Sequence, residues 1–127
     1  MKVSLYFLNE TIVKECQEIL KDENIHSLLR FSILRFLKSI ESDVESFIKT
    51  KEVLIKEYGT EMEDGSFTVI SKDLTEDRFN EFTKKFEELA NNIIELKDQK
   101  FKLSTFSNSP QHYKNWMFEL TENDTNI

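Results

Sequence analysis

The longest signal in the chain is a heptad pattern of apolar residues between Ile33 and Tyr58. Its apolar positions, which Lys51 alone interrupts, are Ile33, Leu37, Ile40, Val44, Phe47, Leu54 and Tyr58. Steps that alternate between four and three residues are typical of an α-helix with one apolar face. Gly59 comes next, at a point where a left-handed residue often ends a helix. The pattern predicts a helix over residues 26–58.

A second heptad pattern predicts a partner for this helix. Its apolar residues are Phe79, Phe82, Phe86, Leu89, Ile93 and Leu96. Thr75 is placed to cap the N-terminus, and the acidic Glu76 and Asp77 in the first turn favour the helix dipole. We expect a helix over residues 76–97 that packs antiparallel against residues 33–58, because two apolar ridges joined by a modest connector can bury each other.

The connector between the two helices carries an acidic cluster on a glycine, Glu63-Asp64-Gly65. An EF-hand loop with Gly65 at its sixth position would put Met62 at the third position and Ser71 at the twelfth. Methionine has no oxygen ligand and the bidentate carboxylate is missing, so we reject a calcium-binding loop. Asp-Gly is instead typical of a type I′ turn. We expect a small β-hairpin at the tip of the helical pair, with a disordered tip as the alternative.

Both ends of the chain are predicted to pack at the base of the helical pair. Residues 2–8 are rich in β-formers, and residues 100–106 alternate apolar and polar side chains, so we expect two strands that pair with each other. Short amphipathic helices are expected over residues 10–22 and 110–121. These segments would cover residues 25–37, which are apolar on more than one face.

The predicted fold is mainly α (α+β minor). It is a long antiparallel helical hairpin with a small β-hairpin at its tip and a short two-stranded pairing plus short helices at its base. The chain has 127 residues but only two glycines and one proline, which suits one domain with long helices and few turns. We expect residues 1–121 to form this domain and residues 122–127 to be a frayed polar tail.

Charge narrows the classes of partner. The net charge is -7, and residues 60–127 carry 8 Lys/Arg against 14 Asp/Glu, whereas residues 1–59 carry 9 against 10. Direct nucleic-acid binding needs clustered positive charge, which the sequence does not supply. No apolar run approaches the roughly 20 residues of a membrane span, so no membrane association is expected. The acidic surface favours solubility, and it could also engage a basic partner.

Candidate catalytic groups are few. Cys16 is the only cysteine and lies on the apolar face of the first predicted helix, so we interpret it as an inert core thiol in a reducing cytoplasm. His26 and His112 are the only histidines, and they lack the short spacings that zinc ligands show. There is no Gly-rich phosphate loop and no nucleophile elbow. We therefore predict no enzymatic activity, no metal and no cofactor.

Aromatic residues near the base are the candidate partner-binding residues. Tyr113, Trp116 and Met117 would share one face of the C-terminal predicted helix, and such side chains are enriched at interface centres. The alternative is that this face only covers the base of the long helix. Phe31 and Phe36 are also expected to be exposed, and a homodimer is one arrangement that would cover them.

Several segments together resemble a known family. They are "SILRFLKSIESDVESFIKTKEVLIKEYG" (32–59), the acidic turn "EDG" (63–65), "FNEFTKKFEELANNIIELK" (79–97), "FKLSTF" (101–106) and "WMFEL" (116–120). Their order is similar to an uncharacterised family of small proteins of tailed phages and prophages of low-GC Gram-positive bacteria, a domain of unknown function. The similarity covers about residues 30–121 and rests on pattern. Its most specific part is Leu-x-x-Ile-x-x-x-Val-x-x-Phe with "KEYG", and its departure is the aromatic "HYKNWMF".

The resemblance implies a phage origin, the bacterial host cytoplasm and no known enzymatic activity, and it supplies no site residues. We expect a non-enzymatic phage protein that acts through protein–protein interaction, as a minor virion component or an assembly factor. The alternative is an acidic phage-encoded inhibitor of a host defence or nucleic-acid-handling protein. In either case the partner is a phage structural protein or a host protein.

Overall fold

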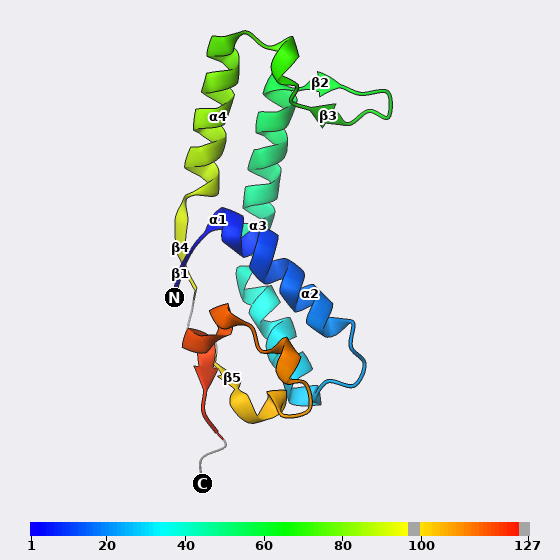
Figure 1. Cartoon of the computed structure of the whole chain (residues 1–127), viewed down its shortest axis with the longest axis vertical. Coiled ribbons are helices and arrows are strands. Elements are labelled where there is room, and N and C mark those ends of the chain that lie inside the picture. The colour runs from blue at the N-terminus through cyan, green and yellow to red at the C-terminus, as the bar shows by residue number, and fades with distance from the viewer. Residues whose placement is uncertain (97–99, 125–127) are drawn as a thin grey trace.

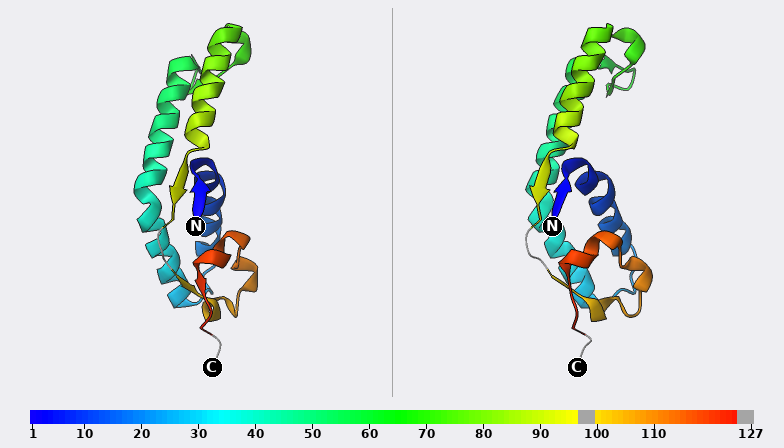
Figure 2. Two further views of the ribbon diagram at one scale, coloured as in Figure 1. Left: turned by 90° about the vertical axis from the view of Figure 1, so that its left-hand side faces the viewer. Right: turned by 60° about the vertical axis from the view of Figure 1, so that its left-hand side comes forward.

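The computed structural model of the chain describes residues 1–96 and 100–124. Within these residues the protein is mainly helical, with three small two-stranded sheets. The long helix α3 (Ser27–Tyr58) runs along most of the molecule, and α4 (Glu76–Ala90) packs against its distal half in the opposite direction (Figure 1). The predicted packing of two long helices is therefore confirmed. Both end segments of the chain gather around the N-terminal half of α3 (Figure 2).

Helix α3 agrees closely with the predicted range of 26–58, but its last residue is followed by an unexpected conformation. At the N-terminus, the Nδ1 atom of His26 accepts a hydrogen bond from the Leu28 N–H at 3.1 Å. The prediction of a left-handed Gly59 is wrong, because this residue is extended, with φ at -93° and ψ at 167°. Glycine is needed there for space, since a Cβ atom would lie 2.3 Å from the carbonyl oxygen of Ile55.

Helix α4 starts as predicted but is shorter than the expected 76–97. The Thr75 Oγ1 accepts a hydrogen bond from the Arg78 N–H at 3.2 Å and caps the helix. The helix ends at Ala90, so the heptad positions beyond this residue are not helical. The next two residues are both asparagine, which has a low helix propensity. They end the helix at a point where the heptad pattern alone would continue it.

The N-terminal strand β1 (Lys2–Ser4) pairs antiparallel with β4 (Ile93–Glu95), which follows α4. The expected pairing of the N-terminal strand with residues 100–106 is therefore wrong. Leu96 is buried and Ile94 packs against the core, whereas Ile93 is exposed, which is the alternation of a half-buried strand. The heptad pattern predicts a helix here instead of strand β4, because Ile93 and Leu96 also fit a helical spacing.

The chain becomes helical directly after β1. The segments α1 (Leu5–Phe7), η1 (Leu8–Val13) and α2 (Lys14–Leu20) form one helical stretch in which η1 is a π-helix. The Ser4 hydroxyl oxygen caps the stretch by accepting a hydrogen bond from the Phe7 N–H at 3.1 Å. The strand predicted over 2–8 thus ends at Ser4, and the helix predicted over 10–22 starts earlier. A short apolar run is ambiguous between a strand and a buried helix, which explains both errors.

The C-terminal segment consists largely of short 3₁₀-helices, so the strand predicted over 100–106 is confirmed only at Phe101–Lys102, and the prediction of a helix over 110–121 is wrong. The 3₁₀-helices are η3 (Leu103–Phe106), η4 (Pro110–His112) and η5 (Asn115–Leu120). Strand pairing is limited to β5 (Phe101–Lys102), which runs parallel to β6 (Thr121–Glu122). Tyr113 and Lys114 have extended backbones and separate η4 from η5, so no continuous helix forms over these described residues.

The tail predicted over 122–127 is held by the fold over its first residues. Glu122 lies in β6. The Asp124 carboxylate accepts hydrogen bonds from the backbone N–H and the hydroxyl of Ser104. The same two hydrogen bonds lower the pKa of the Asp124 carboxyl. The chain is therefore tied down as far as Asp124, and residues 125–127 lie outside the described residues.

The β-hairpin expected at the tip is confirmed, with a different turn. Strands β2 (Thr60–Glu61) and β3 (Phe67–Thr68) pair antiparallel. A type I′ turn needs positive φ at two residues, but Gly65, at 87°, is the one described residue with positive φ. The Gly65 N–H donates to the Met62 carbonyl at 3.0 Å, and the Met62 N–H donates to the Ser66 carbonyl at 2.7 Å. This is a longer hairpin loop with a glycine bulge.

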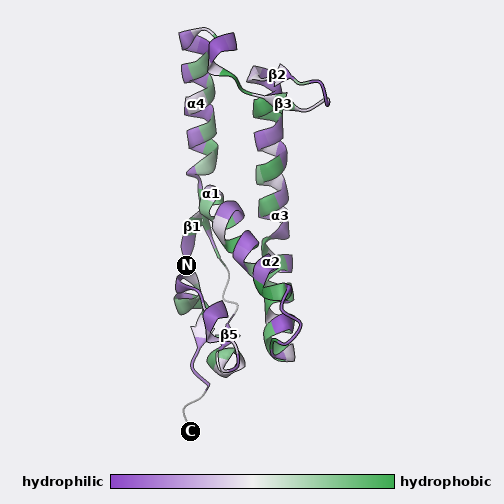
Figure 3. Cartoon of the chain, turned by 45° about the vertical axis from the view of Figure 1, so that its right-hand side comes forward, coloured by the Kyte–Doolittle hydropathy of each residue, from purple (hydrophilic) through white to green (hydrophobic). Residues whose placement is uncertain are grey.

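The hydrophobic core lies at the base and draws on both end segments of the chain and on the N-terminal half of α3. Its most enclosed side chains come from the N-terminal helical stretch, one face of α3 and the C-terminal segment; they are Leu8, Ile12, Cys16, Ile19, Leu29, Ile33, Phe36, Phe101, Met117 and Leu120. We call residues 41–58 of α3 together with α4 the arm. Among the described residues of the arm, only Phe47, Tyr58 and Ala90 are buried. Figure 3 shows hydrophobic residues interspersed with hydrophilic ones along both helices of the arm.

Two phenylalanines of α3 provide a matched test of this packing. Phe36→Ala is expected to lower the free energy of unfolding by about 3–5 kcal/mol, because it leaves a cavity where the ring stacks on Trp116. Phe31→Ala, at an exposed site of the same helix, should cost less than about 1 kcal/mol. Urea denaturation followed by circular dichroism measures both. Equal losses would contradict the orientation of α3.

Candidate functional site

Most of the residues predicted to bind a partner are built into the base. Trp116 stacks on Phe36 with ring centroids 5.6 Å apart, and its Nε1–H donates to the Glu15 carboxylate at 3.2 Å. Met117 is fully buried and Tyr113 is half-buried. The expectation that Phe36 is exposed is wrong, because 1% of it is accessible. Tyr113, Trp116 and Met117 therefore cover the base of α3, as the alternative interpretation of the C-terminal face expected.

Phe31 differs from the other predicted residues, because it is 56% exposed. The Arg35 guanidinium carbon lies 5.7 Å from its ring centroid, which is the geometry of a cation–π contact. Leu28 and Leu34 lie about one helical turn away on either side and are also exposed. Together these side chains form an apolar row on the outer surface of α3.

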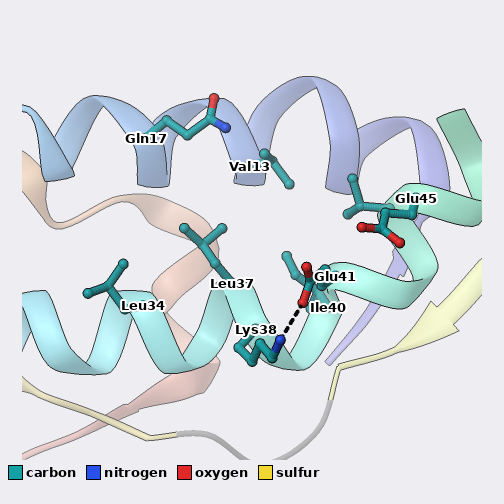
Figure 4. Close-up of a pocket in the computed structure, with 9 residues that line it drawn as sticks. Val13, Gln17, Leu34, Leu37, Lys38, Ile40, Glu41 and Glu45 are labelled. Atoms are coloured by element: carbon teal, nitrogen blue, oxygen red, sulfur yellow. Dashed lines mark ion pairs between the residues drawn. The ribbon is translucent and has the colours of Figure 1, made fainter.

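A groove of about 330 Å³ lies between the N-terminal helical stretch and α3 (Figure 4). Val13 lines one wall, and Leu34 and Leu37 line the other. Lys38 and Glu41 form an ion pair at 3.0 Å on its rim. An open groove with an apolar lining and a charged rim can accept a protein side chain, whereas small-molecule sites enclose most of their ligand.

A larger groove of about 720 Å³ lies between strand β1 and helix η5. Among its lining residues, Phe118 is 77% exposed, Ile93 is 57% exposed and Phe7 is 37% exposed. These three side chains come from segments that are far apart in the sequence. Lys2 and Glu119 add one charge of each sign to the lining. Large apolar side chains that gather in this way are typical of protein-interaction sites. We call this site the Phe118 groove.

Sequence reasoning named none of the three exposed apolar side chains of the Phe118 groove as partner-binding residues. Phe118 falls outside the apolar positions of the predicted C-terminal helix, and this is the one signal in the sequence for an outward side chain. Ile93 fits the heptad of the second predicted helix, whereas β4 places it on the exposed face of a strand. No sequence signal places the two residues at one groove.

Cys16 is a free thiol enclosed in the core. Desolvation raises its pKa to about 12, and the nearby Glu15 carboxylate adds to the shift. A nucleophilic cysteine needs the opposite conditions, which are access to solvent and a lowered pKa. The position and the pKa of this thiol suit a packing role.

His112 and Arg30 both make polar contacts with Asp22 at the base. The Nε2 atom of His112 lies 3.0 Å from the Asp22 Oδ2, and this hydrogen bond is the main cause of a lowered Asp22 pKa, followed by the Asn24 N–H. The Arg30 guanidinium donates to the Asp22 main-chain carbonyl at 2.8 Å. These contacts tie the loop after α2 to η4 and α3. Over residues 1–96 and 100–124, no three His, Cys, Asp or Glu side chains are grouped to hold a metal ion.

Comparison of the chain with protein-family models, with curated proteins and with solved structures finds no match. In the part of the chain that the structure describes, no helix is long and apolar enough to span a bilayer. A functional assignment therefore depends on the resemblance carried by the sequence and on the surface features described above.

The burial of Cys16 makes a direct prediction about its reactivity. In the native protein at neutral pH, we expect it to react with a thiol reagent at least about a hundredfold more slowly than in concentrated urea, because burial blocks access and lowers the thiolate fraction. The rate of colour release from an aromatic disulfide reagent measures this. Similar rates in buffer and in urea would show an accessible thiol and contradict the placement.

Proposed function

We propose that the protein is a non-enzymatic phage protein that binds another protein, as a minor virion component or an assembly factor. The proposal locates it in the bacterial host cytoplasm or in the virion, with a phage structural protein or a host protein as partner. It is supported by the resemblance of about residues 30–121 to small phage and prophage proteins. It is also supported by the Phe118 groove, and it requires no cofactor, nucleic acid or membrane.

The exposure of Phe118 is the observation that carries the proposal. Most of this ring faces water, although full burial of such a side chain is worth about 1.5–3 kcal/mol. Phe7 and Ile93 line the same groove, so a partner that inserts one or two apolar side chains would cover all three together. Aromatic side chains in such positions often supply much of the binding energy.

The lining of the Phe118 groove indicates the chemistry of its partner. Lys2 is basic and Glu119 is acidic, and both flank apolar side chains. Nucleic acids and anionic lipids need clustered positive charge, which this groove lacks. A protein segment with an apolar ridge and flanking charges of both signs fits it best.

An exposed acidic tip favours a second candidate function, inhibition of a host defence or nucleic-acid-handling protein. The carboxylates at the end of the arm face solvent; they are Glu61, Glu63, Asp64, Glu76 and Asp77. In this alternative, the antiparallel helical hairpin is a spacer that holds the acidic tip away from the base. Binding would then depend on charge and weaken steeply with added salt.

Phe118→Asp tests the leading proposal. Tagged wild-type protein is used to capture its partner from cells infected with the parent phage, and mass spectrometry of purified particles shows whether the protein is a virion component. Calorimetric titration with the purified partner then measures affinity. We expect Phe118→Asp to raise the dissociation constant at least about tenfold, because it places a charge in an apolar contact. Val53→Asp, at an exposed apolar site on the arm, is the matched control and should change little.

The two candidate functions predict that different variants lose partner binding. Equal affinities of the wild type and Phe118→Asp would overturn the groove as the partner site. If the combined change Glu61→Lys and Glu63→Lys abolishes binding instead, and purified particles lack the protein, the inhibitor alternative replaces the leading proposal.

A further inference from the structure

A second apolar surface, separate from the Phe118 groove, lies on the outside of α3. Leu28, Phe31 and Leu34 follow one another at steps of three residues and are about half exposed. Leu29, next to the first of them, is enclosed in the core, so the exposed row is not an extension of the core face. We call the outer surface of α3 over residues 28–48 the α3 stripe.

The apolar part of the α3 stripe continues into the groove of Figure 4. Leu34 belongs to both, and Leu37, Val44 and Val13 extend the apolar lining toward the arm. Ile48 follows one turn later and lines a smaller hollow. A helix advances about 30 Å over this length. The stripe therefore winds partly around α3 and offers apolar contacts at both ends.

The charges of the α3 stripe are ordered by sign along the helix. Arg35 and Lys38 come first, Glu41 and Glu45 follow, and all four side chains are exposed. Side chains three or four residues apart share one face of a helix, so these charges flank the apolar row. A surface that is basic at one end and acidic at the other is complementary to a copy of itself turned end for end.

An antiparallel second copy, related by a two-fold axis near residue 40, matches both the charges and the apolar groups. Positions equally distant from the axis face each other, so Lys38, which pairs with Glu41 of its own chain, would also face Glu41 of the second copy. Arg35 would face Glu45 of the second copy. In the same register, the exposed Phe31 would lie against Ile48 of the second copy. Leu34 would likewise enter the groove near Val44. A parallel pair would instead set like charges opposite each other.

We infer that the α3 stripe is the surface through which two copies of this chain associate, antiparallel and about a two-fold axis. The inference does not depend on the proposed partner, because the Phe118 groove is formed by other elements. Stable interfaces bury about 800 Å² on each side, and a single helical strip of about 30 Å is small beside this value. The association should therefore be reversible, with a dissociation constant in the micromolar range or weaker.

Sedimentation equilibrium over a concentration series tests the inference. The monomer has a mass of 15.1 kDa, and we expect the wild-type mass to rise toward twice this value at high concentration. Leu34→Glu should raise the dimer dissociation constant at least about tenfold, because it buries a charge in the apolar contact. Phe118→Asp should leave dimerisation unchanged, and Leu34→Glu should leave binding at the Phe118 groove unchanged. The two variants thus separate this inference from the proposed function.

Charge reversal tests the antiparallel register. Lys38→Glu alone should weaken the dimer, because it sets two acidic side chains opposite each other. Adding Glu41→Lys restores opposite signs and should recover the affinity, with circular dichroism confirming that each variant is folded. A wild-type mass that stays at 15.1 kDa at the highest concentration, or Leu34→Glu that associates as the wild type does, would overturn the inference. Failure of the double variant to recover affinity would overturn the register.

Discussion

The fold depends on covering the N-terminal half of α3. Helix α4, which packs against α3, does not reach this half. An isolated helix has marginal stability in water, so it relies on the burial of its apolar face. Helix α4 packs against the distal half alone, and the two end segments of the chain cover the rest. Phe36 lies at the centre of this cover, 5.6 Å from the rings of both Trp116 and Phe101. The hydrogen bond from Trp116 to Glu15 then joins the C-terminal cover to the N-terminal one.

This arrangement gives the molecule one strong core and a thinner arm. In the arm, the Tyr58 ring packs 5.6 Å from Phe82, which packs 5.9 Å from Phe86. The Tyr58 hydroxyl donates to Glu81 at 2.8 Å, and this hydrogen bond is the main cause of the lowered Glu81 pKa. The Arg78 guanidinium lies 4.3 Å over the Tyr58 ring. Few side chains of the arm are buried in comparison with the base, so the arm should open before the base does.

Helix periodicity is local, and this is why the sequence predicts the limits of α3 and the Thr75 cap of α4. Strand pairing is not local. Ile93 and Leu96 fit a heptad pattern, but Ile93 lies in β4 and Leu96 follows it, and β4 forms by pairing with β1 near the N-terminus. The residues of the candidate site likewise divide into those that local sequence predicts and those that depend on the fold. Its residue type makes Trp116 a candidate for partner binding, but aromatic side chains are common both in cores and in interfaces. Only the fold shows that Trp116 belongs to the core. Phe31 lies in a helix and keeps its predicted exposure, whereas the Phe118 groove exists only where three distant segments meet.

Native-state hydrogen exchange, followed residue by residue by NMR, tests the central claim most directly. If the two end segments hold the protein together by covering the base of α3, amides of residues 29–40 will exchange only through global unfolding. Their protection free energies will then equal the unfolding free energy from urea denaturation, while amides of α4 will exchange through a partial opening of lower free energy. Equal protection in the two regions, or stronger protection in α4, would contradict the account.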